Sequence, residues 1–331
     1  MMPFEYRRAE DVEGALTLMS ENVDAAFLAG GTNLVDRMKL GVVRPRMVID
    51  VSRLPLASVE VRSDGGVRIG ATVRNSDLAA HPVIRSRYAV LARALLSGAS
   101  GQLRNAATTA GNLMQATRCV YFQDVTTPCN KREPGSGCSA IGGYVRYHAI
   151  LGASDQCIAV HPSDMAVALA ALDAVIVVRD EGGEHRIPIT EFYRLPGDSP
   201  ERDTALTPNQ LIVAVELPAP APAALSTYLK TRDRASFAFA LVSVAAEIEL
   251  ENDIVTGARI ALGGVAHRPW RAYKAEEVLR GSTATEEVFI RAADAELADA
   301  KPQSGNAFKI PLTRGVMVSI LRSLTAGRST K

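Results

Sequence analysis

The stretch AAFLAGGTNLVDRMKLGVVRPRMVIDVS, residues 25–52, decides the fold of the N-terminal part of the chain. Residues 25–30 form an apolar run with the length of a strand, residues 33–41 favour a helix, and residues 46–52 are a second apolar run. Strand, helix and strand within about 30 residues predict a parallel pair joined by a right-handed crossover. We therefore expect a small βαβ unit over residues 1–55.

A second part with a mixed sheet is predicted over residues 56–218. Residues 58–73 alternate apolar and polar side chains around an Asp-Gly-Gly turn, which indicates a β-hairpin. The periodicity of residues 75–84 and 88–100 predicts two helices, and residues 164–180 read as a helix that runs into a strand.

A proline-rich linker marks the next boundary, with prolines at positions 218, 220 and 222. Beyond it, residues 236–265 predict two long antiparallel strands, and residues 270–281 and 313–324 predict helices. The fold class is therefore α+β: a two-part N-terminal domain, with a βαβ unit and a mixed-sheet subdomain, and a C-terminal α+β domain over residues 224–331 with an antiparallel sheet.

Composition excludes several classes of function. The chain has 331 residues, of which 47% are hydrophobic, and a formal net charge of +1. A net charge so near zero does not favour a nucleic-acid partner. The sequence has no apolar run of about 18 residues, so no membrane span is expected. It also shows no export signal near its first residues.

Two turns rich in glycine and small residues are candidate ligand contacts. LAGGTNLVD, residues 28–36, joins a strand to a helix, and TTAGNL, residues 108–113, has a similar character. Such turns permit positive φ and present successive backbone N–H groups to an anion. A tight turn capped by Thr32 or Asn33 explains the first pattern equally well. Neither turn has the spacing of a dinucleotide fingerprint or of a phosphate loop.

The four cysteines of the chain gather in one segment with the spacing C-x9-C-x8-C-x18-C: Cys119, Cys129, Cys138 and Cys157. Such clustering indicates that a single group binds all four. The spacing lacks the close pair that is usual at zinc sites, and it matches no familiar ferredoxin pattern. Spacing alone therefore leaves zinc, an iron–sulfur cluster and disulfides open. We expect a loop insertion at about residues 115–160.

Five separated motifs resemble, in order and spacing, the FAD-binding medium subunit of the xanthine dehydrogenase family of molybdenum hydroxylases. They are LAGGTNL (28–34), TTAGNL (108–113), HPSDMAVALAALDA (161–174), YLKTRDRASFAFALVSVA (228–245) and ALGGVAHRPWRA (261–272). Within this family the likeness is strongest to the FAD subunit of the bacterial periplasmic aldehyde oxidoreductase, which carries an additional [4Fe-4S] cluster. One departure is Ala110, which stands where the family pattern has a glycine.

The resemblance implies a set of FAD contacts, which would make the N-terminal domain the FAD-binding domain. It implies Leu28, Ala29, Gly30, Gly31, Thr32, Asn33 and Leu34 in the first turn, Thr108, Gly111 and Asn112 in the second, and Ser163, Asp164 and Lys230 elsewhere. Phe237 and Phe239 lie where the family approaches the flavin, although packing on a strand explains them equally well. His148 and His161 are interpreted as ordinary polar loop residues.

The resemblance also implies a [4Fe-4S] cluster on Cys119, Cys129, Cys138 and Cys157, a set of four thiolates that suits such a cluster. The implied function is that of an electron-transfer subunit without catalytic residues of its own. It would take electrons from a small partner with two [2Fe-2S] clusters and pass them through FAD to an external acceptor, while a large partner with the molybdenum cofactor oxidises an aldehyde.

Two other functions remain open at this stage. They are a stand-alone flavin oxidase and a non-catalytic scaffold with a zinc-stapled cysteine loop. For the compartment, the resemblance implies the periplasm, reached by co-export with a signal-bearing partner, and the cytoplasm is the alternative.

Overall fold

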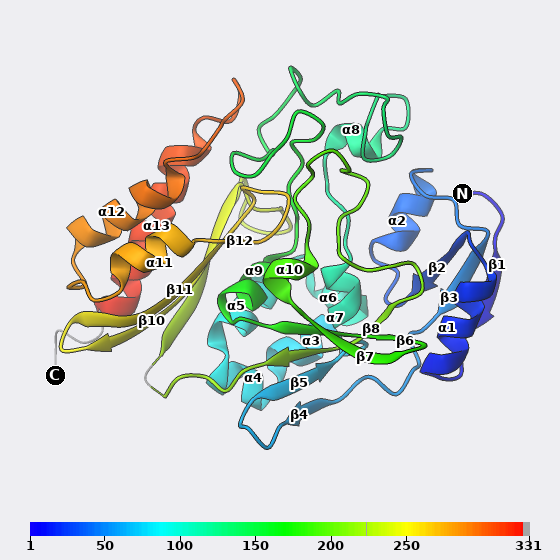
Figure 1. Ribbon diagram of the computed structural model, residues 1–331, viewed down its shortest axis with the longest axis horizontal. Helices are drawn as coiled ribbons and strands as arrows, with labels where there is room; N and C mark the ends of the chain where they lie inside the picture. The colour runs from blue at the N-terminus through cyan, green and yellow to red at the C-terminus, as the bar shows by residue number, and fades with distance from the viewer. Residues whose placement is uncertain (223, 327–331) are drawn as a thin grey trace.

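The computed structural model describes residues 1–222 and 224–326, and its N-terminal unit is the predicted parallel one (Figure 1). The unit comprises β1 (Glu5–Arg8), α1 (Val12–Glu21), β2 (Ala25–Leu28), α2 (Leu34–Lys39) and β3 (Met47–Asp50). The sheet has the order β1-β3-β2, with both pairs parallel, which confirms the strand–helix–strand prediction. The sequence did not reveal β1, because its four residues are all exposed and lack an apolar pattern.

The second sheet is antiparallel in every pair between its described strands, whereas a mixed sheet was predicted. Its order is β4-β5-β8-β6-β7. The strands are β4 (Val59–Val61), β5 (Val67–Gly70), β6 (Val175–Asp180), β7 (Gly183–Pro188) and β8 (Leu211–Leu217). The predicted hairpin is β4–β5, and all seven residues of β8 are buried, because it lies at the centre of the sheet.

Eight helices lie in this second part of the described chain. They are α3 (Asn75–Ala80), α4 (Pro82–Arg87), α5 (Ala89–Ser97), α6 (Gly101–Ala106), α7 (Thr109–Leu113), α8 (Val120–Gln123), α9 (Asp164–Ala171) and α10 (Ile189–Phe192). The helix predicted over residues 75–84 is two helices, because a residue before proline favours an extended backbone and His81 has ψ 128°.

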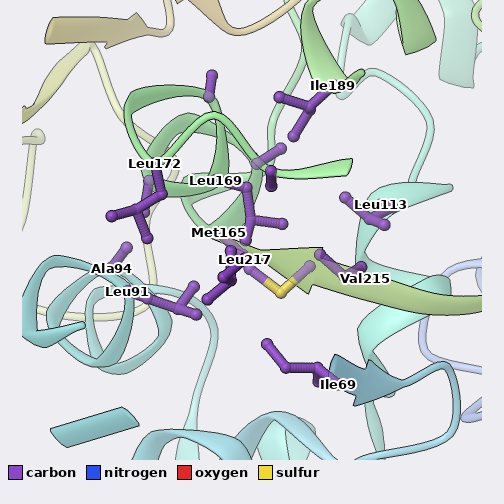
Figure 2. Close-up of a cluster of buried hydrophobic side chains, with 14 of the residues drawn as sticks. Ile69, Leu91, Ala94, Leu113, Met165, Leu169, Leu172, Ile189, Val215 and Leu217 are labelled. Carbon is purple, nitrogen blue, oxygen red and sulfur yellow. The ribbon is translucent and has the colours of Figure 1, made fainter. Parts of the chain in front are cut away.

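Helix α9 is the centre of the hydrophobic core. All eight of its residues are buried, and α5, β10 and β11 pack around it. Figure 2 shows Met165, Leu169 and Leu172 among side chains from α5, β5 and β8. A helix that is apolar on nearly every side is stable only inside a core. Because α9 packs against α5 of the N-terminal domain and against β10 and β11, it joins that domain to the C-terminal sheet.

The C-terminal part is a four-stranded antiparallel sheet covered by three helices, as the fold class predicted (Figure 1). Its elements are β9 (Leu225–Thr231), β10 (Val242–Glu251), β11 (Ile254–Gly263), β12 (Trp270–Arg271), α11 (Tyr273–Leu279), α12 (Glu286–Leu297) and α13 (Lys309–Thr325). Asn252 and Asp253 turn β10 into β11 with φ of 47° and 63°, which suits a tight hairpin. The sequence did not reveal β9 or α12.

Each sheet lies within one of the three predicted parts, and the boundaries at residues 55, 218 and 224 stay predictions. Residues 327–331 of the last predicted part lie outside the described residues. No helix in the described chain combines the length and apolar character that a membrane span requires.

Lys309 attaches α13 to the rest of the chain from a fully buried position. Its Nζ donates hydrogen bonds to the carbonyl oxygens of His148 (2.9 Å) and Gly264 (2.7 Å). Burial, and secondarily the charge of Arg146, lowers the pKa of Lys309 from 10.5 to about 7. The folded chain therefore releases a proton from Lys309 at a pH where the unfolded chain still holds it.

This pKa shift predicts a specific pH dependence of stability. Between about pH 7 and pH 9 the unfolded state binds more protons, so the free energy of unfolding rises by up to ~1.4 kcal/mol per pH unit from this residue. The Lys309→Met variant lacks this contribution, so its deficit relative to wild type should grow with pH. Urea denaturation at pH 7, 8 and 9 measures it. The control is Lys301→Met, at an exposed position, and a deficit of Lys309→Met that stays constant with pH contradicts the prediction.

Candidate functional site

A cleft of about 810 Å³ lies where the three parts of the chain meet. Gly31 lines it from the turn after β2, Asn112 from α7, Asp164 from α9 and Lys230 from β9. A cleft in this size range, lined by apolar surface with a few polar groups, is typical of cofactor sites.

A buried ion pair forms the floor of the cleft and joins two parts of the chain. The Nζ of Lys230 lies 2.7 Å from Oδ2 of Asp164, and the two side chains are 3% and 8% exposed. Lys230 also donates to the carbonyl oxygen of Ser97, and the hydroxyl of Tyr228 donates to Oδ1 of Asp164 at 2.5 Å. Both charges are therefore satisfied without solvent, as buried charges must be.

The first glycine turn brings the N-terminal unit into close backbone contact with the second part. A Cβ on Gly30 would lie 2.0 Å from the carbonyl oxygen of Ala106, so only glycine fits there. Gly31 has φ 72°, in the region that favours glycine. The side chain of Asn33 does not cap α2. Its Oδ1 instead accepts a hydrogen bond from the backbone N–H of Ala116, which lies just beyond the second turn.

The second turn is the N-terminus of a short helix, α7. The hydroxyl of Thr108 accepts a hydrogen bond from the N–H of Gly111, and Oδ1 of Asn112 accepts one from the hydroxyl of Ser163 at 2.5 Å. Ser163 also caps α9 by accepting from the N–H of Ala166. These contacts hold the second turn against the start of α9.

The structure brings most of the predicted FAD contacts together. Those that line the cleft are Gly31, Thr32, Asn33, Gly111, Asn112, Ser163, Asp164 and Lys230, with Phe237 and Phe239. Leu28, Ala29, Gly30, Leu34 and Thr108 are not among the residues that line it. These five belong to the same two turns, where Gly30 approaches the Ala106 carbonyl and the hydroxyl of Thr108 accepts from the N–H of Gly111.

Sequence reasoning missed several cations and polar atoms of the cleft. The missed cations are Lys39, Arg104, Arg118 and Arg234, which come from four separate segments and follow no local pattern. Five lining residues each carry a buried side-chain atom without a hydrogen-bond partner among the described residues: Asn75 Oδ1, Arg118 Nε, His148 Nδ1, His161 Nε2 and Ser243 Oγ. Unpartnered buried atoms in a native structure call for a ligand or water, so the cleft fits a polar cofactor.

The four cysteines, of which consecutive ones are separated by 8 to 18 residues in the sequence, all line a second and smaller cavity. All four are free thiols, so no disulfide joins them. The segment wraps around this cavity with one short helix, α8, and an isolated bridge between Cys129 and Cys138. Figure 1 shows it as a largely irregular excursion at one edge of the molecule.

Burial favours the protonated form of two of these thiols, Cys119 and Cys157, in the absence of a positive centre. It raises the pKa of Cys119 to about 11 and that of Cys157 to about 12. Ligation requires thiolates, so only a strongly cationic group would reverse this preference. Within residues 1–222 and 224–326, no group of three or more histidine, cysteine or acidic side chains is arranged to hold a single metal ion.

The basic and imidazole side chains near the cysteines have definite contacts. The Nζ of Lys131 is buried and pairs with Asp203, and the guanidinium of Arg132 donates to carbonyl oxygens of the loop itself. His148 and His161 lie outside helices and strands, as interpreted, but they are not ordinary surface loop residues. Both line the larger cleft, and His148 is only 3% exposed.

The comparisons with known proteins establish the family. Residues 2–220 match the family described as the FAD binding domain in molybdopterin dehydrogenase, and residues 227–323 match the CO dehydrogenase flavoprotein C-terminal domain. The chain belongs to the FAD-binding subunits of the molybdenum hydroxylase family, and it is an oxidoreductase subunit.

Individual relatives show which members of this family the chain resembles. The chain is 50% identical to the aldehyde oxidoreductase FAD-binding subunit PaoB of Escherichia coli K12, across 98% of this chain and 99% of that protein. It is 25% identical to the glyceraldehyde dehydrogenase medium chain of Sulfolobus acidocaldarius, across 84% and 81%. The solved carbon monoxide dehydrogenase of Hydrogenophaga pseudoflava superposes with a TM-score of 0.77 at 26% identity, across 98% of this chain and 99% of that one.

The close approach at Gly30 yields a test of the first turn. Gly30→Ala places a methyl group against the Ala106 carbonyl, so we expect a loss of about 1–3 kcal/mol in the free energy of unfolding and reduced FAD content. Flavin absorbance and urea denaturation measure both. Gly101→Ala is the matched control, because nothing lies within 4 Å of its added Cβ. Unchanged FAD content and stability in Gly30→Ala would show that the contact is unimportant.

The buried pair at the floor yields a second test. Lys230→Met leaves Asp164 without its cation, and we expect a loss of about 3–5 kcal/mol in the free energy of unfolding. Adding Asp164→Asn should restore part of this loss, so the double variant is more stable than the two single losses predict. A double-mutant cycle by urea denaturation measures the coupling. Strictly additive losses would contradict a direct interaction.

Proposed function

We propose that this chain is the FAD- and [4Fe-4S]-carrying electron-transfer subunit of a molybdenum-containing aldehyde oxidoreductase. It receives electrons from the two [2Fe-2S] clusters of a small partner, and FAD delivers them to an external acceptor. A large partner with the molybdenum cofactor oxidises the aldehyde. The 50% identity to the E. coli aldehyde oxidoreductase subunit supports the substrate class.

One observation carries the proposal of a cluster. Four free thiols from a largely irregular loop line a single cavity, and that cavity adjoins the cleft of the FAD-binding domain. A cubane cluster needs four thiolates around a volume, whereas zinc needs four ligands at about 2.3 Å from one point. All four cysteines line one small cavity, and within the described residues no set of three converges as a single ion requires. These features favour a cluster over a zinc staple.

The residues of the cleft have the chemistry that FAD requires. Thr32 lines the cleft from the first turn with a polar side chain, Asn112 does so from the second, and the cations Arg104 and Arg118 supply charge for a pyrophosphate. FAD supplies the electron-transfer chemistry when bound, while the chain binds, orients and shields it. The eight predicted contacts that line the cleft are proposed as its binding residues on this basis, and the other five as residues that shape the two turns around it.

Partners and compartment follow from the same proposal. The complex is a heterotrimer, and this chain reaches the periplasm by co-export with a signal-bearing partner. Cofactors that must be inserted before export suit transport in the folded state. Recovery of the assembled complex from the cytosolic fraction would overturn the proposed compartment without affecting the proposed cofactors.

Metal and flavin analysis of the complex, purified without oxygen, tests the proposal. We expect one FAD per chain and about four iron atoms in this chain beyond those of the partner clusters. Cys129→Ser should lose these iron atoms and keep FAD, because Cys129 lines only the smaller cavity. Ser139→Ala, which alters another residue lining that cavity, is the control and should keep both.

Other outcomes favour the alternatives. FAD with one zinc per chain would make the cysteine loop a structural staple. Full aldehyde turnover by the isolated chain would support a stand-alone flavin oxidase, and absence of both cofactors from folded protein would refute the proposal.

A further inference from the structure

Cys119 differs from the other three cysteines in its position. It lines the smaller cavity together with Cys129, Cys138 and Cys157, and it also lines the larger cleft. Thr117 is likewise shared by both cavities, so residues 117–119 form a common wall. Any group held by the four cysteines would therefore lie next to the cleft on the side of Cys119.

His148 contacts the sulfur of Cys119 from the cleft side of this wall. Its Nε2 lies 3.2 Å from the Sγ of Cys119, and its ring lines the cleft but not the smaller cavity. The side chain is 3% exposed, so water does not compete for the contact. The backbone N–H groups of Tyr121 and Phe122 also donate to this sulfur, but no substitution of a side chain can remove them.

The direction of the hydrogen bond between His148 and Cys119 depends on whether the sulfur carries a proton. A free thiol can either donate or accept, but a cysteine sulfur that ligates a metal has no proton to donate. With Cys119 as a ligand, the imidazole must therefore donate its Nε2–H.

The backbone of His148 is held in place by the C-terminal domain. Its carbonyl oxygen accepts hydrogen bonds from Nζ of Lys309 and Nδ2 of Asn306, and its N–H donates to the carbonyl oxygen of Val145. Lys309 and Asn306 are both fully buried. The imidazole is thus positioned against the sulfur by three backbone contacts rather than left on a free loop.

From this geometry we propose that His148 is a positioning residue that tunes the group held by the cysteines. It donates Nε2–H to the Cys119 sulfur and thereby raises the reduction potential of that group. A hydrogen bond to a ligand sulfur stabilises the more negative, reduced form, which is how proteins tune iron–sulfur centres. This inference rests on the proposed function, because it requires a redox group on the four cysteines.

A redox titration followed by EPR tests the inference on the complex purified without oxygen. The signal that Cys129→Ser lacks identifies the cysteine-held centre. In His148→Leu the donor is lost, so the reduction potential of this centre should fall relative to wild type. His148→Gln keeps an amide N–H near the position of Nε2 and should restore most of the potential. His161→Leu removes the other histidine that lines the cleft, whose Nε2 has no hydrogen-bond partner among the described residues, and should leave the potential unchanged.

The outcomes separate the inference from the proposed function. Wild-type complex without iron in this chain refutes the cluster and the inference together. Iron-loaded His148→Leu with a wild-type potential refutes only the role of His148, and so do equal shifts in the Leu and Gln variants. If His148→Leu loses the iron of this centre, its potential cannot be compared. Pulsed EPR of wild-type and His148→Gln complex labelled with ¹⁵N-histidine then shows whether the His148 imidazole contacts the centre. A nitrogen coupling present in wild type and lost in His148→Gln supports the inference, and its absence from wild type refutes it.

Discussion

The buried ion pair of Asp164 and Lys230 is the interaction on which the cleft depends. Asp164 begins α9, the fully buried helix at the centre of the core, and Lys230 lies on β9 of the C-terminal sheet. Two charges taken out of water must satisfy each other closely, so the pair admits little freedom in how the C-terminal sheet sits against α9. This one constraint fixes how α9 and β9, which both line the cleft, lie relative to each other.

Close contact between two backbone segments joins the first glycine turn to the chain on both sides of the second turn. Gly30 allows the turn after β2 to approach the Ala106 carbonyl so closely that no larger residue fits, and Asn33 ties the same turn to Ala116. The two glycine turns, about 80 residues apart, therefore act as one surface. This arrangement explains why turn residues that do not line the cleft still matter to it, because they set the separation of those that do.

The cysteine segment is an exception to the packing of the rest of the chain. Around Cys119, Cys129 and Cys138 its core contacts are small separate clusters, and only Ile150 and Leu151 near its end join the large C-terminal core among the described residues. Burial raises the pKa of the Cys119 and Cys157 thiols and so makes them poor ligands in the absence of a cation, while binding of a cationic group would release protons and add folding free energy. A loop of this length in a compact domain is stable at low cost when a bound group organises it. The wall at Cys119 and His148 would then join that group to the cleft.

The sequence by itself determined the α+β class, the parallel crossover of β2 and β3, the β10–β11 hairpin and the family, because periodicity, turn residues and motif order are local properties. It also singled out the cysteines as one set. Exposed β1, helix α12 and the scattered cations of the cleft lacked any local signal. Only the tertiary structure decided that Asp164 meets Lys230, that Cys119 faces both cavities, and that His148 is buried against its sulfur. These are contacts between residues 29 to 66 positions apart, and their energies depend on burial that no local pattern encodes.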